Sequence, residues 1–161
     1  MMDSAHNSVF LPDCGKDCLM TAIGNALSAM QASMMRLNAS ASNIANIRST
    51  GVMPGEGAGG DTSANPPASS SVSAYQPIYT VQSESAGGGT VATYAPTKPA
   101  TLPSYDPSSS HANEAGMVAM PNVSFVSELT EQQMARLSFE ANVKVIETAH
   151  KATGSLLESW A

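Results

Sequence analysis

The chain has 161 residues, of which 12% are charged and 5% aromatic, and its formal net charge is −6. Because ordinary soluble proteins carry about 25% charged residues and fill large cores with aromatic side chains, a large compact core is not expected. The seven Lys and Arg residues are scattered, which argues against nucleic acid or an anionic membrane as a partner, and no apolar run reaches the roughly 20 residues of a membrane span.

Residues 1–19 form a leader without hydrophobic periodicity, and we expect it to be disordered. Two interpretations stay open: either Met20 is the natural start of the protein, or the leader is a dispensable extension. The segment lacks the apolar run of a secretory signal, so export would need another route. Cys14 and Cys18 lie near His6, but a structural zinc site needs four ligands, and we interpret both as incidental thiols.

Residues 20–50 are predicted to form a long amphipathic helix. Its larger apolar residues recur at alternating spacings of four and three, the average period of 3.5 that is typical of a coiled-coil seam. These residues are Ile23, Leu27, Met30, Met34, Leu37 and Ile44, with Ala41 in register between the last two. Gly51 and Pro54 are expected to end the helix.

Two asparagines, Asn43 and Asn46, lie near the end of this helix, although Asn is a poor residue for a helix interior. One interpretation is that their side-chain amides bond to a partner or to the helix end. The other is ordinary fraying of the last turn, and the competing backbone bonds of Asn are compatible with both.

Residues 51–121 are predicted to be an irregular middle rich in Pro and Gly. Residues 51–73 have almost nothing to bury and read as a loop or disordered linker. Residues 78–81 and 90–94 are β-prone with three glycines between them, which predicts a small β-hairpin near 78–94. Five prolines in residues 96–121 predict an extended connection. The run GEGAGG at residues 55–60 matches a dinucleotide motif in letters alone, because no strand precedes it and no helix follows it.

Residues 122–161 are predicted to form the second long helix. One apolar stripe runs along it, formed by Met134, Leu137, Ala141, Val145, Ala149, Ala152 and Leu156. Glu140 with Lys144, and Glu147 with Lys151, are spaced as i, i+4 ion pairs and indicate a solvated face.

The predicted fold is therefore mainly α: two long terminal amphipathic helices forming a coiled-coil-like pair, joined by the irregular middle. No arrangement of residues matches a nucleophile elbow, a zinc-protease motif or a phosphate-binding loop. We expect no catalytic site, no cofactor and no metal.

Three segments resemble the axial proteins of the bacterial flagellar rod and hook. Residues 37–46, LNASASNIAN, resemble the N-terminal motif of that family, and residues 141–149, ANVKVIETA, resemble its C-terminal motif. Between them, YDP at residues 105–107 and GMVAMPNV at residues 116–123 resemble a segment of proximal rod members. Residues 47–50 depart from the family pattern, and residues 52–104 align poorly.

The resemblance implies a structural subunit of the basal-body rod, exported unfolded through the flagellar type III apparatus without a cleavable signal. It implies terminal helices packed in the inner layer of a rod that transmits torque across the periplasm, with copies of itself, other rod proteins and the export apparatus as partners. The expected assembly interface comprises Ile23, Leu27, Met30, Met34, Leu37, Asn43, Ile44, Asn46, Met134, Leu137, Ala141, Asn142, Val145, Ala149 and Leu156. The alternatives are another flagellar axial protein, a secreted helical interaction protein, or an enzyme with an unrecognised site.

Overall fold

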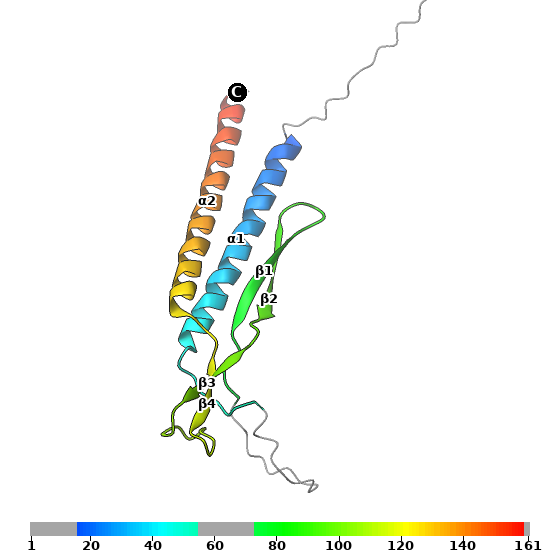
Figure 1. Ribbon diagram of the computed structural model, residues 1–161. Helices are drawn as coiled ribbons and strands as arrows, with labels where there is room; N and C mark the ends of the chain where they lie inside the picture. Colours follow the sequence, from blue (N-terminus) through cyan, green and yellow to red (C-terminus); the bar gives the residue numbers. More distant parts are fainter. Residues whose placement is uncertain (1–15, 55–72, 160–161) are drawn as a thin grey trace, which may run out of the picture.

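The computed structural model describes residues 16–54 and 73–159. Two long helices and two β-hairpins make up this part of the chain. In chain order the elements are α1 (Lys16–Ala45), β1 (Ile78–Glu84), β2 (Thr90–Pro96), β3 (Thr101–Tyr105), β4 (Met117–Pro121) and α2 (Phe125–Glu158). Figure 1 shows α2, α1 and the β1–β2 hairpin side by side along one elongated body, with β3 and β4 at the end where α1 stops and α2 starts.

The two helices run antiparallel, because residues later in α1 contact residues earlier in α2. Ser33 Oγ donates to Ser138 Oγ at 3.2 Å. Further along α1, Ser40 Oγ donates to the backbone oxygen of Glu128 at 2.9 Å. The ends of the described chain therefore lie at the same end of the molecule (Figure 1). Neither helix is long and apolar enough, within the described residues, to cross a membrane.

The prediction of a coiled-coil pair is wrong, because small side chains fill the seam between the helices. Ala26, Ser33 and Ser40 recur every seven residues on α1 and are buried, as are Ala135 and Ala149 on α2. A coiled-coil seam needs large apolar knobs that enter holes on the facing helix. Here the large apolar residues of the predicted stripes lie mostly outside the seam.

The β1–β2 hairpin is antiparallel, with Ile78 opposite Pro96 and Glu84 opposite Thr90. Its turn holds Gly88 and Gly89 at φ angles of 87°, a conformation that side chains with a Cβ rarely adopt. The hairpin lies along α1, where the backbone N–H of Thr90 donates to Ser28 Oγ at 3.1 Å. The predicted hairpin segment thus forms a two-stranded sheet that covers one side of α1.

The extended connection predicted for residues 96–121 is a second hairpin, so the prediction of an irregular middle is wrong here. Strands β3 and β4 pair from Thr101 opposite Pro121 to Tyr105 opposite Met117. Pro103 is tolerated because β3 is an edge strand, where an N–H is not needed for pairing. The fold is therefore not mainly α with an irregular middle, since four antiparallel strands in two small sheets accompany the helices.

The chain after α1 joins this second hairpin directly. Gly51 and Ala119 exchange two backbone hydrogen bonds, of 3.0 and 2.9 Å, on the free side of β4. Val52 bridges Ser73 in the same region. Residues 55–72, which make up most of the predicted linker at 51–73 and include its glycine run, lie outside the described residues. So do residues 1–15 of the predicted leader, with His6 and Cys14, whereas residues 16–19 belong to α1.

Candidate assembly interface

Asn43 is the point where α1, α2 and β1 are joined. Its side chain is 3% exposed. The Nδ2 group donates to the backbone oxygen of Ile78 and to Glu128 Oε1, both at 2.8 Å. The Oδ1 atom accepts from the backbone N–H of Ile78 and from the Tyr75 hydroxyl, both at 3.1 Å. All four hydrogen-bonding capacities of the amide are used.

Asn46 has a more local role at the end of the same helix. Its Nδ2 group donates to the backbone oxygen of Ser42 at 2.9 Å, and its own backbone oxygen accepts from the N–H of Ser49 at 3.0 Å. Of the two interpretations left open by the sequence, the amide-bonding one describes both residues. Asn43 bonds to a strand and to the other helix, and Asn46 bonds to the helix end.

An ion pair joins the two helices about two helical turns before Asn43 on α1. Arg36 Nε donates to Glu131 Oε1, and this hydrogen bond raises the pKa of the Arg36 guanidinium above its usual value. Between residues 20 and 45, Arg36 is the only charged residue. Because that charge is paired within the subunit, the other side chains of residues 20–45 are apolar or neutral polar.

The side of α1 away from the hairpin and α2 exposes large apolar residues. Met20 is 79% exposed, and Leu27 and Met34 are each 50% exposed. Ile23 lies beside them and is also exposed. This surface is unusual for a monomeric protein, because scattered apolar side chains are normal but a continuous exposed row marks an interaction site.

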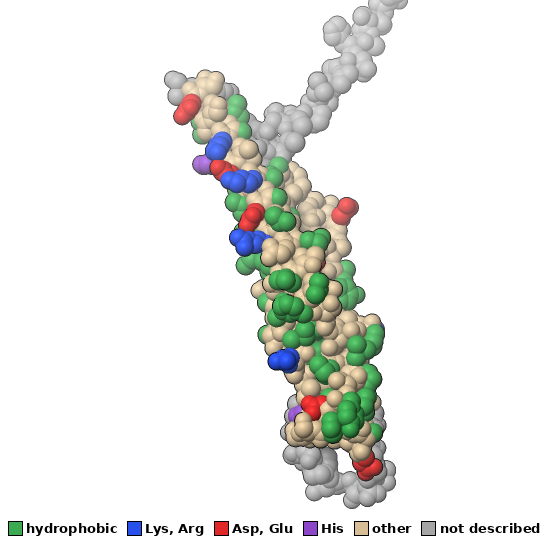
Figure 2. All heavy atoms as spheres, turned by 60° about the vertical axis from the view of Figure 1, so that its left-hand side comes forward, with side chains coloured by type: hydrophobic (Ala, Val, Ile, Leu, Met, Phe, Trp, Pro, Cys, Tyr) green, Lys and Arg blue, Asp and Glu red, His purple; other side chains and the backbone are tan. Residues whose placement is uncertain are grey.

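The exposed side of α2 is divided into two flanks. On one flank the predicted stripe is open to solvent: Leu137 is 64% exposed, and Met134, Ala141 and Val145 are exposed as well. The other flank carries the charged residues. Figure 2 shows Lys, Arg, Asp and Glu side chains following one side of the elongated body, with a hydrophobic band beside them.

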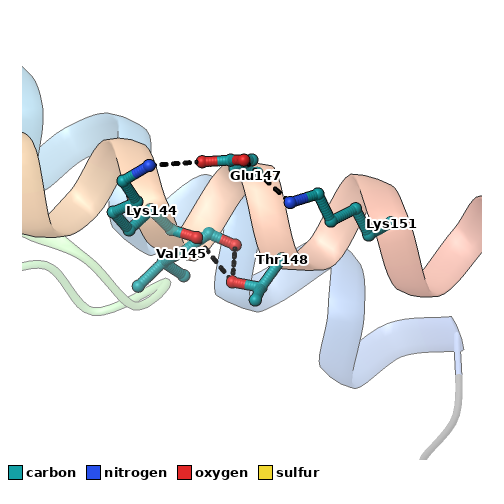
Figure 3. Close-up of polar contacts among 5 residues, drawn as sticks. All are labelled: Lys144, Val145, Glu147, Thr148 and Lys151. Atoms are coloured by element: carbon teal, nitrogen blue, oxygen red, sulfur yellow. Dashed lines mark hydrogen bonds and ion pairs between the residues drawn. The ribbon is translucent and has the colours of Figure 1, made fainter.

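The charged flank is a ladder of ion pairs within α2. Glu147 accepts from Lys144 at 2.8 Å and from Lys151 at 2.9 Å, and Figure 3 shows the two lysines reaching it from either side. Arg136 pairs with Glu140 at 3.0 Å. The predicted Glu147–Lys151 pair is therefore present, whereas Lys144 pairs with Glu147 and not with Glu140.

The two lysines should set the acid titration of Glu147. The pKa of Glu147 is lowered first by the hydrogen bond from Lys144 and then by that from Lys151. A lowered folded-state pKa adds stability above the unfolded-state pKa, which is lost as pH falls through the folded value, so the contribution of Glu147 to the ladder should be lost in acid. Replacing both lysines with Ala should raise the pKa of Glu147 toward its ordinary value in an NMR titration of its carboxyl carbon. Arg136→Ala is the control and should leave that pKa unchanged.

The residues of the expected interface fall into three groups. Exposed on the subunit are Ile23, Leu27, Met34, Met134, Leu137, Ala141, Val145 and Leu156. Partly buried are Met30, Leu37, Ile44, Asn46 and Asn142, while Asn43 and Ala149 are buried. The sequence reasoning missed the exposed face of the β1–β2 hairpin, formed by Tyr79, Val81 and Val91. It also missed the buried seam, whose only signal is the recurrence of Ala and Ser every seven residues.

Within the part of the chain that the structure describes, no group of three or more His, Cys, Asp or Glu residues is placed to hold a metal ion. The arrangement offers surfaces for packing, namely a charge-free face of α1, an apolar flank of α2 and the outer face of a hairpin.

Comparison with known proteins places these features in a family. A sequence family described as the C-terminal part of flagellar basal body rod FlgEFG proteins matches residues 114–158, which span β4 and all of α2. The flagellar basal-body rod protein FlgC of Salmonella typhimurium is 30% identical over 124 residues, covering 75% of this chain and 82% of the relative. FlgC of Salmonella typhi matches with the same identity and coverage.

Proposed function

The chain belongs to the family of flagellar basal-body rod proteins, and from this premise we propose how its geometry builds a rod. It is a structural subunit of the basal body, similar to FlgC. The proposal concerns the surfaces through which it joins copies of itself and other rod components, and the mechanical work that those contacts perform.

The proposal rests on where side chains of different size lie: small ones are buried between the helices, and large apolar ones are exposed. The seam inside the subunit is filled by Ala and Ser, while Leu27, Met34 and Leu137 are half or more exposed. Burying apolar surface is worth roughly 25 cal/mol per Å². A subunit can therefore gain more free energy by burying these large side chains against its neighbours than by closing its own seam. Contacts between unlike surfaces on successive subunits build rings or helical filaments.

The mechanism is mechanical and involves no chemistry. Long helices that each touch several neighbours can pass a twisting load from one subunit to the next. The subunit therefore needs neither a catalytic residue nor a cofactor, and we infer that it is not an enzyme. We also infer that it reaches the rod through the flagellar export apparatus in an unfolded state, which suits a chain whose own seam buries only small side chains.

Replacing Leu137 with Asp tests this proposal. Because Leu137 is 64% exposed, the isolated subunit should tolerate a carboxylate there and keep the helical circular dichroism of the wild type. In the rod the same carboxylate would be buried without a partner, at a cost of several kcal/mol in each subunit. Cells that carry only this variant should lack rods and should not swim.

Glu140→Ala is the matched control, because Glu140 lies one helical turn away on the charged flank, in an exposed pair with Arg136. Its loss should cost a few tenths of a kcal/mol, and swimming should stay close to normal. If rods containing Leu137→Asp assemble and rotate normally, the proposed packing of this flank is wrong.

A further inference from the structure

A groove runs along α1 between α2 and the β1–β2 hairpin. At one end it opens into a hollow of about 470 Å³. Ala22, Ala26 and Ala29 of α1 form the floor of this hollow, the hairpin turn forms one wall, and Val145 of α2 contributes to the other. Asn25 completes the floor, and Glu84 and Asn142 add polar groups to the walls. A bulky apolar side chain that enters would rest on the three alanines, with these polar groups around it.

A second hollow of about 330 Å³ lies further along the same groove. Its floor is formed by Arg36, Ala39 and Ser40 of α1, and its walls by β1 and by the first turns of α2, including Ser127. Thr80 lines this hollow, and its buried hydroxyl has no hydrogen-bond partner among the residues that the structure describes. We call the two hollows together the α1 groove, which spans residues 22–40 and is about 27 Å long at the helical rise of 1.5 Å per residue.

The opposite side of α1 carries a row of large side chains with a matching repeat. Met20, Leu27 and Met34 recur every seven residues and are half or more exposed; with Ile23 we call them the α1 ridge. Met20, Leu27 and Met34 each lie two positions before a residue of the groove; these groove residues are Ala22, Ala29 and Arg36. Residues two positions apart on an α-helix point about 200° apart, so the ridge and the groove face nearly opposite directions.

We propose that the α1 ridge of one copy docks in the α1 groove of the next copy, an inference that rests on the proposed function. Three observations select this occupant. The ridge, about 21 Å long at the same rise, fits within the length of the groove. Its repeat of seven residues equals the repeat of the floor. It carries no charge, so it can be buried without the cost of desolvating an ion.

The charged flank of α2 does not fit the same groove, because its ion pairs would lose water on entry. In the second hollow the guanidinium of Arg36 is already paired with Glu131, so it needs no charged group from the occupant. Because ridge and groove lie on opposite sides of one helix, the contact is heterologous. Each subunit then offers a free ridge at one side and a free groove at the other, as growth of a ring or a helical row requires.

Disulfide trapping between two different variants tests the contact in the assembled rod. The full chain, with Cys14 and Cys18 replaced by Ser, would carry Leu27→Cys in one copy and Val145→Cys or Ser127→Cys in the other. The two variants would be produced together in cells that lack the native chain, and isolated basal bodies would be oxidised. We expect covalent heterodimers in yields several-fold above those of either variant alone.

Lys144→Cys is the matched control for Val145→Cys, because it is the next residue but lies on the charged flank, and it should not cross-link to Leu27→Cys. Homodimers formed by Leu27→Cys alone would show ridge packed on ridge and would overturn the proposal. So would basal bodies that contain the variants but yield no heterodimer, while the proposed function would stand. Absence of the cysteine-free parent chain from basal bodies would overturn both.

Discussion

Replacing Asn43 with Leu is expected to lower the free energy of unfolding of the subunit by about 2–4 kcal/mol, since each buried polar group left unpaired costs roughly 1–3 kcal/mol. Leu has the same branched arrangement of heavy atoms as Asn but larger terminal groups, so the change removes every hydrogen bond of the side chain without leaving a cavity. The N–H and C=O groups of Ile78 would both lose their side-chain partner, and Glu128 would lose a donor. The better helix propensity of Leu recovers only a few tenths of a kcal/mol.

Urea unfolding of the isolated chain, followed by helical circular dichroism, measures this loss. Asn46→Leu is the matched control, because Asn46 bonds only to the backbone of its own helix end, and its replacement should cost well under half as much. Hydrogen exchange should separate the two further, with protection lost at the start of β1 in the Asn43 variant alone. Equal effects of the two substitutions would show that Asn43 does not join the three elements energetically.

Gly51→Ala is expected to detach the β3–β4 hairpin from the end of α1. A Cβ at position 51 would lie 2.1 Å from the backbone nitrogen of Ala74 and 2.7 Å from the carbonyl carbon of Ser73. Backbone atoms cannot rotate away as a side chain can, so the chain must move and the two hydrogen bonds to Ala119 should break. Overpacking of this kind costs about 1–3 kcal/mol or more.

Gly24→Ala provides the opposite expectation from the same chemical change. Nothing lies within 4 Å of the Cβ that Ala would add at position 24 of α1, and Ala is favoured over Gly within a helix by about 1 kcal/mol. The midpoint temperature of thermal unfolding should therefore fall for Gly51→Ala and rise for Gly24→Ala. A Gly51→Ala subunit as stable as the wild type would mean that the junction with β4 carries little of the fold.

The helices and the first hairpin could be predicted because their signals are local. The repeating apolar residues of α1 and α2 and the glycine-rich turn between β1 and β2 each lie within one short stretch of sequence. The β3–β4 hairpin could not, because its prolines usually mark irregular chain and only the pairing itself reveals that Pro103 is on an edge strand. Its further partner, Gly51, lies far away in the sequence.

The register of the helix seam escaped prediction for a different reason. Large apolar side chains dominate any hydrophobic pattern, so the stripe through Leu27 and Met34 outweighs the one through Ser33 and Ser40. The pattern identifies a surface that avoids water, but one chain cannot tell whether its own second helix or another molecule covers that surface. Asn43 illustrates the same limit, since its partner Ile78 is defined only by the folded chain.

The seam of small side chains has a consequence for how the subunit responds to its surroundings. A pair of helices joined by small side chains and a few polar contacts buries little apolar surface by closing on itself, whereas in the proposed packing each added neighbour would cover Leu27, Met34 or Leu137. Folding of the subunit and its assembly with neighbours are then linked by mass action. The fraction of folded subunit therefore depends on the subunit concentration as well as on temperature. Dilution would loosen a lone subunit at a temperature at which the finished structure stays intact.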